Sequence, residues 1–240
     1  MTNRQKFLQH IGQTSPFPLA LEMTRAKGVY MYDIDENSYL DLISGIGVSN
    51  IGHCHPKVVE AVQTQVAKYM HLMVYGEFIQ SPQVELAAAL AETLPDTLNA
   101  VFFVNSGTEA AEGAMKLAKR YTGRTQFISA YKAYHGATNG ALSLQSEEEF
   151  AQPFRPLLPD IKHIEYNNLE DLSIITEATA AVILETVQGE AGVRPPKPGY
   201  LKAVKARCEE VGALLILDEI QTDSCKEQQT FIEWWMMQWG

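Results

Sequence analysis

The chain has few cysteines, no excess of positive charge and no long apolar run, and each shortage argues against a class of protein. Its three cysteines are an odd number scattered over 240 residues, which favours free thiols in a reducing compartment over a disulfide framework. The net charge of -10 is the wrong sign for binding nucleic acid or an anionic membrane. No stretch approaches the roughly 20 apolar residues that span a bilayer, and the start lacks the apolar core of a secretory signal. We therefore expect a soluble, cytoplasmic protein that acts on small molecules.

The residues that are present form an α/β pattern. Hydrophobic residues make up 46% of the chain, enough for one sizeable core. Between about residues 86 and 217, short β-like runs alternate with helical periodicity, which predicts a largely parallel sheet flanked by helices. The predicted buried strands are 101–104, 181–184 and 214–217. The predicted helices are 82–94, 109–121 and 201–211, the last of them ended by Gly212.

An N-terminal segment, GVYMYDIDENSYLDL, predicts a β-hairpin in a small separate layer. The turn-prone DIDEN is flanked on both sides by an alternating pattern, with Val29, Tyr30 and Tyr32 before it and Tyr39 and Leu40 after it.

The first candidate site lies in VFFVNSGTEAAEGAMKLAKR, where Ser106, Gly107 and Thr108 separate a predicted strand from a predicted helix. Backbone amides at a helix N-terminus bind phosphate, glycine permits close approach, and the two hydroxyls add donors. The structural alternative is an S-x-x-E capping box between Ser106 and Glu109, which needs no ligand. Taken alone, this segment favours the capping box.

The second candidate is Asp218 in LLILDEIQ, a carboxylate at the end of a hydrophobic strand with Glu219 and Gln221 beside it. Such an acid suits the protonated ring nitrogen of an electron-accepting cofactor. It also suits magnesium, as in a Walker-B motif. Because the chain contains no GxxxxGK followed by Ser or Thr, the nucleotidase alternative lacks its phosphate loop.

Three further segments carry reactive side chains. In AYKAYHGATNGALS, Tyr134 and His135 precede Gly136 in a segment too rich in small residues for a packed helix. The pair suits stacking on a flat ring, and equally a tyrosine that covers the sheet beside a surface histidine. GHCHP lacks the ligand spacing of zinc sites and predicts a tight turn. The acidic run 147–149 predicts a solvated loop or a helix start.

Taken in order, these motifs resemble the class III aminotransferases, the group that includes acetylornithine, ornithine and 4-aminobutyrate aminotransferases. The resemblance runs from about Pro18 to Thr222, through GVYMYDIDENSYLDLISGIGVSNIGHCHP, VFFVNSGTEAAEGAMKLAKRYTGR, AYHGAT, ETVQGEAGV and LLILDEIQT. It implies a partial type I pyridoxal-phosphate-dependent transferase fold, pyridoxal 5'-phosphate as cofactor, and an amino acid and a 2-oxo acid as substrates. It also implies a homodimer for the full-length family.

The resemblance assigns roles to residues of four motifs. Around the cofactor phosphate it places Ser106, Gly107 and Thr108. Around the pyridine ring it places Tyr134 on one face with His135 beside it, Ile220 on the other face, Asp218 at the ring nitrogen, Gln221 near the phenolic oxygen and Glu185 as a supporting acid. On the substrate side it places Glu190.

This sequence departs from the family pattern at two places. Ala137 stands where members acting on acetylornithine usually carry an arginine, so that specificity is not indicated. In the family, LDEIQT continues into GFGRTG and then the Schiff-base lysine, an amine that needs a lowered pKa. Here Asp223 begins a different tail, which holds all three tryptophans and no match to that lysine. The tail is either a genuine amphipathic helix or the product of a frameshift or truncated gene, and we favour the second.

The sequence thus predicts three segments. These are 1–60 with the hairpin, 61–222 as an incomplete cofactor-binding domain, and 223–240 as a divergent tail. The predicted function is an aminotransferase by descent, with the chain as given inactive. The alternatives are another pyridoxal-phosphate reaction, such as an aminomutase or a decarboxylase, and a non-catalytic binding or dimerising protein.

Overall fold

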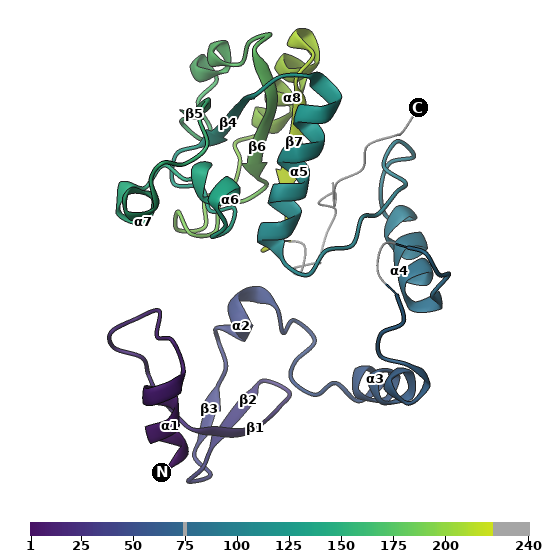
Figure 1. Ribbon diagram of the computed structural model, residues 1–240, viewed down its shortest axis with the longest axis vertical. Coiled ribbons are helices and arrows are strands. Elements are labelled where there is room, and N and C mark those ends of the chain that lie inside the picture. Colours follow the sequence, from purple (N-terminus) through teal and green to yellow (C-terminus); the bar gives the residue numbers. More distant parts are fainter. Residues whose placement is uncertain (74–75, 223–240) are drawn as a thin grey trace. The chain divides into compact units, whose positions relative to one another are not determined.

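The computed structural model describes residues 1–73 and 76–222, and the chain forms two compact units, Met1–Phe78 and Ile79–Gly240 (Figure 1). The boundary drawn from the sequence after residue 60 stays a prediction. The predicted tail lies outside the described residues. Within the two described ranges, no helix is long and apolar enough to cross a membrane.

The first unit is built around a three-stranded antiparallel sheet. Its elements are α1 (Asn3–His10), β1 (Met23–Lys27), β2 (Tyr30–Asp33), β3 (Ser38–Leu40), α2 (Ser44–Gly47) and α3 (Pro56–Lys68). The strand order is β1-β2-β3, and Tyr30 of β2 lies opposite Leu40 of β3. The predicted hairpin is therefore confirmed as β2 and β3, and β1 adds a third strand that the prediction did not name.

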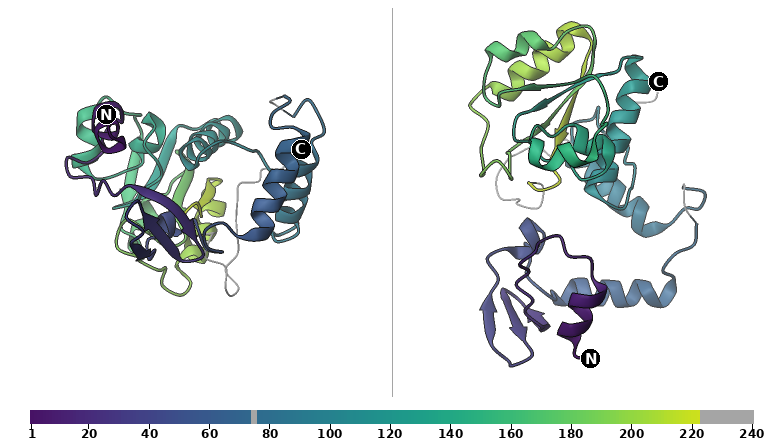
Figure 2. Two further views of the ribbon diagram at one scale, coloured as in Figure 1. Left: turned by 90° about the horizontal axis from the view of Figure 1, so that it is seen from below. Right: turned by 60° about the vertical axis from the view of Figure 1, so that its left-hand side comes forward.

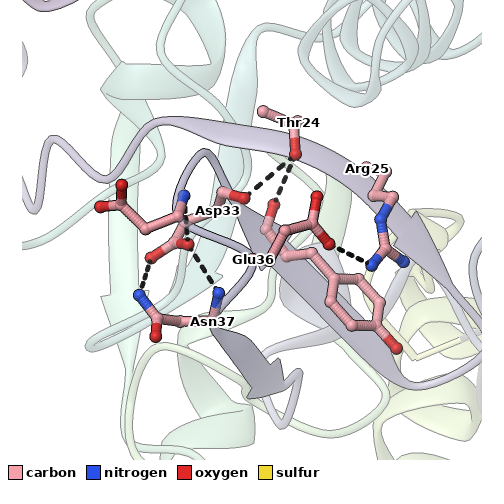
Figure 3. Close-up of polar contacts among 7 residues, drawn as sticks. Thr24, Arg25, Asp33, Glu36 and Asn37 are labelled. Atoms are coloured by element: carbon pink, nitrogen blue, oxygen red, sulfur yellow. Dashed lines mark hydrogen bonds and ion pairs between the residues drawn. The ribbon is translucent and has the colours of Figure 1, made fainter.

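One buried carboxylate holds the hairpin turn together (Figure 3). Asp33 accepts hydrogen bonds from the backbone and side-chain N–H groups of Asn37, both at 2.9 Å, and from the Tyr39 hydroxyl at 2.7 Å. The side-chain hydrogen bonds from Asn37 and then Tyr39 hold the pKa of Asp33 below its ordinary value. An exposed ion pair between Arg25 and Glu36, 2.6 Å long, joins β1 to the same turn.

The tight turn predicted at GHCHP is confirmed. Cys54 has a left-handed φ of 55°, and His53 pairs through its backbone with Gly28. The Nε2 atom of His53 lies 2.8 Å from Oδ2 of Asp41, which ties this turn to the start of α2. Cys54 is an exposed free thiol, and Cys208 of the second unit is a buried one.

The second unit contains the predicted parallel sheet. Its helices are α4 (Ser81–Ala91), α5 (Gly107–Thr122), α6 (Asn139–Ser143), α7 (Glu148–Ala151), α8 (Tyr200–Val211) and the 3₁₀ turns η1 (Gln152–Phe154) and η2 (Glu170–Ile174). Its strands are β4 (Gln126–Ala130), β5 (Ile161–Ile164), β6 (Thr179–Glu185) and β7 (Leu214–Asp218). The strand order is β5-β4-β6-β7, and every neighbouring pair is parallel.

Helices cover the two faces of this sheet, α5 on one and α8 on the other (Figure 2). Along β6, which is buried throughout, Val182 and Leu184 pack with α8, whereas Ala181 and Ile183 pack with α5. This two-sided burial explains why β6 reads as a continuous apolar run.

The strands predicted at 181–184 and 214–217 are confirmed as β6 and β7, and the three predicted helices as α4, α5 and α8, with Gly212 as the C-cap of α8. The acidic run also forms a helix start, α7.

The strand predicted at 101–104 is wrong. That segment forms no strand, and Phe102 is 81% exposed. An apolar run becomes a strand only beside a hydrogen-bonding neighbour, and the described sheet offers this segment none. The expectation that the segment after Tyr134 is too rich in small residues for a packed helix is also wrong, because 139–143 forms the buried helix α6.

Candidate active site

The carboxyl ends of β6 and β7 present two carboxylates on one face of the sheet. Glu185, the last residue of β6, is the register partner of Asp218, the last residue of β7. Because side chains alternate along a strand, both point to the same face as Ile183 and Ile216, which pack in the core under α5. Both acids therefore lie where open α/β sheets place their ligand crevice.

Two hydrogen bonds fix the Asp218 carboxylate. Its Oδ2 lies 2.7 Å from Nδ1 of His135, and its Oδ1 accepts from the backbone N–H of Ile220 at 3.1 Å. Because a carboxylate only accepts, Nδ1 of His135 is the donor in this pair. The His135 side chain is fully buried, so the surface-histidine alternative is wrong. Its Nε2 atom is buried and has no partner within residues 1–73 and 76–222.

Glu185 joins the loop after β4 to the turn after β6. Its Oε1 accepts from the backbone N–H of Tyr134 at 3.1 Å, and its Oε2 accepts from that of Gly189 at 2.8 Å. Burial raises the pKa of the Glu185 carboxyl, although the two backbone hydrogen bonds oppose that shift. Tyr134 is 50% exposed, so half of its surface stays open to a ligand.

Helix α5 begins at the predicted phosphate turn. The Ser106 hydroxyl accepts from the Glu109 N–H at 3.3 Å, and the Glu109 carboxylate accepts from the Asn105 N–H at 2.6 Å. Ser106 thus caps the helix, as the capping-box alternative predicts. The Glu109 carboxylate, however, accepts from the backbone N–H of Asn105 and not from that of Ser106. The cap leaves the N–H groups of Gly107 and Thr108 without an acceptor in the described part of the chain, because the first turn of a helix has none of its own.

Close contacts bring together the start of α5, the loop after β4 and the residues after β7. A Cβ on Gly107 would lie 2.8 Å from the Ile220 side chain, and a Cβ on Gly136 would collide with the Thr108 side chain. Gly136 also has a φ of 125°, a conformation that glycine adopts at little cost. A small hollow is lined by Ala110, Ala111, Ile183, Ile216, Leu217, Asp218, Glu219 and Ile220. Asp218 and the first turns of α5 therefore border one space.

The remaining predicted residues lie at the rim of this space or beyond it. Gln221 packs so closely on Gly189 that a Cβ there would collide with the Gln221 amide. The Ile220 side chain is 40% exposed beside Gly107. Glu190 is exposed and forms no hydrogen bond or ion pair with other described residues. The structure thus gathers the predicted cofactor residues and leaves Glu190 apart.

The family model for class-III aminotransferases matches residues 12–231. The chain belongs to the class III aminotransferase family. Acetylornithine aminotransferase from Methanopyrus kandleri is 45% identical over 223 residues, which cover 92% of this chain and 56% of that protein. Acetylornithine aminotransferase from Archaeoglobus fulgidus is 45% identical over 199 residues, which cover 82% of this chain and 52% of that protein.

Solved structures agree with this membership. Adenosylmethionine-8-amino-7-oxononanoate aminotransferase from Methanocaldococcus jannaschii superposes with a TM-score of 0.84 at 32% identity, covering 92% of this chain and 55% of that one. Taurine:2-oxoglutarate aminotransferase from Bifidobacterium kashiwanohense, solved with pyridoxal phosphate and glutamate, has a TM-score of 0.79 at 27% identity, covering 90% of this chain and 54% of that one. The chain spans about half the length of the relatives it matches.

Two residues of this class III aminotransferase chain were not predicted to belong to the site. Glu112 and Thr138 form hydrogen bonds that connect α5 to the loop carrying Tyr134 and His135. A signal existed for Glu112, since it follows Thr108 by four residues and therefore shares its face of the helix. Nothing comparable marked Thr138, whose partners come from a distant part of the chain.

Proposed function

We propose that this chain carries the pyridoxal 5'-phosphate site of an aminotransferase, which moves an amino group between an amino acid and a 2-oxo acid. The observation that carries the proposal is the buried carboxylate of Asp218, oriented by His135 at the edge of a hollow that the start of α5 also borders. Membership of the class III aminotransferases supports the reaction class.

The start of α5 fits the phosphate of this cofactor. The N–H groups of Gly107 and Thr108 have no acceptor among the described residues and lie at the positive end of a 16-residue helix. The Ser106 hydroxyl accepts from Glu109 and keeps its own hydrogen for another acceptor. Three donors around a helix N-terminus suit a phosphate dianion.

The surroundings of Asp218 fit the pyridine ring. When bound, the cofactor supplies an electron-accepting ring, and a carboxylate beside the ring nitrogen favours its protonated form. The exposed side chains of Tyr134 and Ile220 suit the two flat faces of that ring. Gln221 and Glu185 suit the polar atoms around it, and the exposed Glu190 suits the substrate side.

The proposed substrates are an amino acid and a 2-oxo acid as classes. Two of the relatives are named acetylornithine aminotransferases. At position 137, however, the exposed alanine offers no charge to a substrate carboxylate. The proposal therefore does not extend to acetylornithine.

For the whole protein we also propose a homodimer, and for the 240-residue polypeptide alone we expect no turnover. No residue of this chain matches the Schiff-base lysine of the family, the amine that acts as a covalent and proton-carrying group. Incubation of the purified polypeptide with cofactor and a panel of amino acids should yield no 2-oxo acid by mass spectrometry. Formation of more 2-oxo acid than the cofactor and amino acids yield without the polypeptide would contradict the expected inactivity.

Equilibrium dialysis against pyridoxine 5'-phosphate tests the cofactor site. This ligand carries an alcohol in place of the aldehyde, so it does not condense with surface lysines. We expect saturable binding that Asp218→Asn weakens by about tenfold or more, since hydrogen bonds to charged groups contribute roughly 1.5–3 kcal/mol. The matched control, Asp96→Asn, changes an exposed acid of the same unit and should bind as the unchanged chain does.

An absence of saturable binding would instead support a non-catalytic protein that keeps the fold. The other alternative, an aminomutase or decarboxylase, uses the same cofactor-binding residues, so binding does not separate it from an aminotransferase. Product analysis on a full-length relative does.

A further inference from the structure

A carboxylate outside the predicted site joins two of its parts. Glu112 lies one helical turn after Thr108 on α5. Its Oε1 atom accepts from the Thr138 hydroxyl at 2.6 Å, from the Gly140 N–H at 2.8 Å and from the Ala141 N–H at 3.3 Å. Glu112 therefore supplies the first turn of α6 with the acceptor that the N-cap residue Thr138 does not provide.

The same hydrogen bonds determine the direction of the Thr108 hydroxyl. Thr138 has one hydroxyl hydrogen, and Glu112 takes it because a carboxylate only accepts. In the 2.7 Å contact between the two threonine hydroxyls, Thr108 must therefore be the donor. The Thr108 oxygen in turn accepts from the Thr138 N–H at 3.2 Å. The one hydroxyl hydrogen of Thr108 is thus directed at the Thr138 oxygen.

Two glycines allow this arrangement. A Cβ on Gly140 would collide with the Glu112 carboxylate, and a Cβ on Gly136 would collide with Thr108. Gly136 directly follows His135, the residue that donates to Asp218. The loop between β4 and α6 is therefore held to α5 at both threonines and at the start of α6.

From these contacts we propose that Glu112 is a positioning residue of the cofactor site. Through Thr138 it holds the loop that carries Tyr134 and His135 against α5, and it commits the Thr108 hydroxyl to that contact. The cofactor phosphate then receives the N–H groups of Gly107 and Thr108 and the Ser106 hydroxyl, and not the Thr108 hydroxyl. This inference rests on the proposed function for its ligand.

Hydrogen exchange without any ligand tests the contact itself. In the 240-residue chain, Glu112→Ala should accelerate exchange at the Gly140 and Ala141 amides by about tenfold, since both lose a charged acceptor. Glu112→Gln keeps an acceptor oxygen and should restore most of the protection. Glu209→Gln, an exposed acid on α8, is the matched control. Unchanged exchange in Glu112→Ala would overturn the proposal.

Binding of pyridoxine 5'-phosphate compared with pyridoxine, which lacks the phosphate, tests the role of Thr108. Thr108→Val and Thr138→Val should weaken both ligands by similar factors, because both variants loosen the loop that meets the ring. Ser106→Ala should weaken only the phosphorylated ligand, and the matched control Thr93→Val, at an exposed threonine of the same unit outside the site, should bind both as the unchanged chain does. A Thr108→Val effect confined to the phosphorylated ligand would show a direct phosphate contact and overturn the assignment.

The two arms separate this inference from the proposed function. If the unchanged chain binds neither ligand, the proposed function fails. The exchange measurement then decides alone whether Glu112 holds the start of α6.

Discussion

The pair formed by Asp218 and His135 shows how far single residues could be predicted. The position of Asp218 at a strand end identified it as a candidate acid, and β7 places it there. Its partner was not foreseen, because residues 135 and 218 meet only when β4 and β7 are brought into one sheet on either side of β6. A sequence pattern locates a side chain on its element, whereas the partner depends on the packing of elements.

At Asp33, hydrogen bonding makes stability depend on pH. The folded pKa lies below the ordinary value of 3.8, so the ionised carboxylate stabilises the fold above about that pH and this stabilisation is lost as the pH falls through the lower folded value. We predict that Asp33→Asn lowers the stability of the first unit, Met1–Phe78, at pH 7. The difference in stability between this variant and the unchanged chain should shrink at acid pH. Hydrogen exchange of the β2 and β3 amides at pH 7 and pH 3 measures it.

The control for this prediction is Asp35→Asn, which changes the neighbouring exposed acid. A difference between Asp33→Asn and the unchanged chain that stays constant from pH 7 to pH 3 would contradict the stated role of the Asp33 charge.

At the scale of elements, prediction succeeded where a segment carries its own signal. Helix α8 has helical spacing and a glycine C-cap, and β6 is an apolar run buried on both faces. The failure at 101–104 has the opposite cause. Its apolar residues satisfy a strand pattern, but a strand is a property of a pair, and no described segment pairs with it. The prediction that 139–143 forms no packed helix failed because it considered the segment alone. The small residue Gly140 leaves room for the Glu112 carboxylate, which comes from another helix.

The core strand β6 should tolerate truncation poorly. Leu184 is fully buried between β4, β7 and α8, so Leu184→Ala should lower the free energy of unfolding by about 2–5 kcal/mol through lost burial and the cavity left behind. Leu169→Ala, at a leucine that is 58% exposed in the same unit, should change it by less than about 0.5 kcal/mol. Urea unfolding followed by far-ultraviolet circular dichroism measures both. Equal losses would contradict the assignment of β6 to the core.

At the scale of the whole molecule, the chain divides into two compact units, and all the predicted cofactor residues fall in the second. The sequence predicted an N-terminal hairpin layer and an α/β layer. Residues alternate with a strand period around DIDEN, whereas short β-like runs and helical periodicity alternate after about residue 86. The boundary that the sequence suggests after residue 60 stays a prediction, because a domain boundary depends on which residues contact one another and not on a local change of composition.

Ligand binding should stabilise the second unit, which contains all the predicted cofactor residues. A ligand present at 100 times its dissociation constant raises the free energy of unfolding by about 2.7 kcal/mol when it binds only the folded state. We predict that pyridoxine 5'-phosphate raises the melting temperature of the 240-residue chain by about 5–10 °C under that condition. Differential scanning calorimetry measures the shift, and the Asp218→Asn variant at the same ligand concentration should show a smaller one. An unmoved melting temperature would show that the ligand does not prefer the folded chain over the unfolded one and would contradict the prediction.

The contact between Gly140 and Glu112 also limits the order in which this protein can change during evolution. The three atoms nearest to a Cβ at position 140 all belong to Glu112, so alanine at 140 is unfavourable as a first step. After Glu112 has been replaced by a shorter residue, that collision is gone, and the higher helix propensity of alanine then favours it over glycine. The two positions are thus epistatic. A lineage that once loses the carboxylate and then gains the alanine has no easy route back.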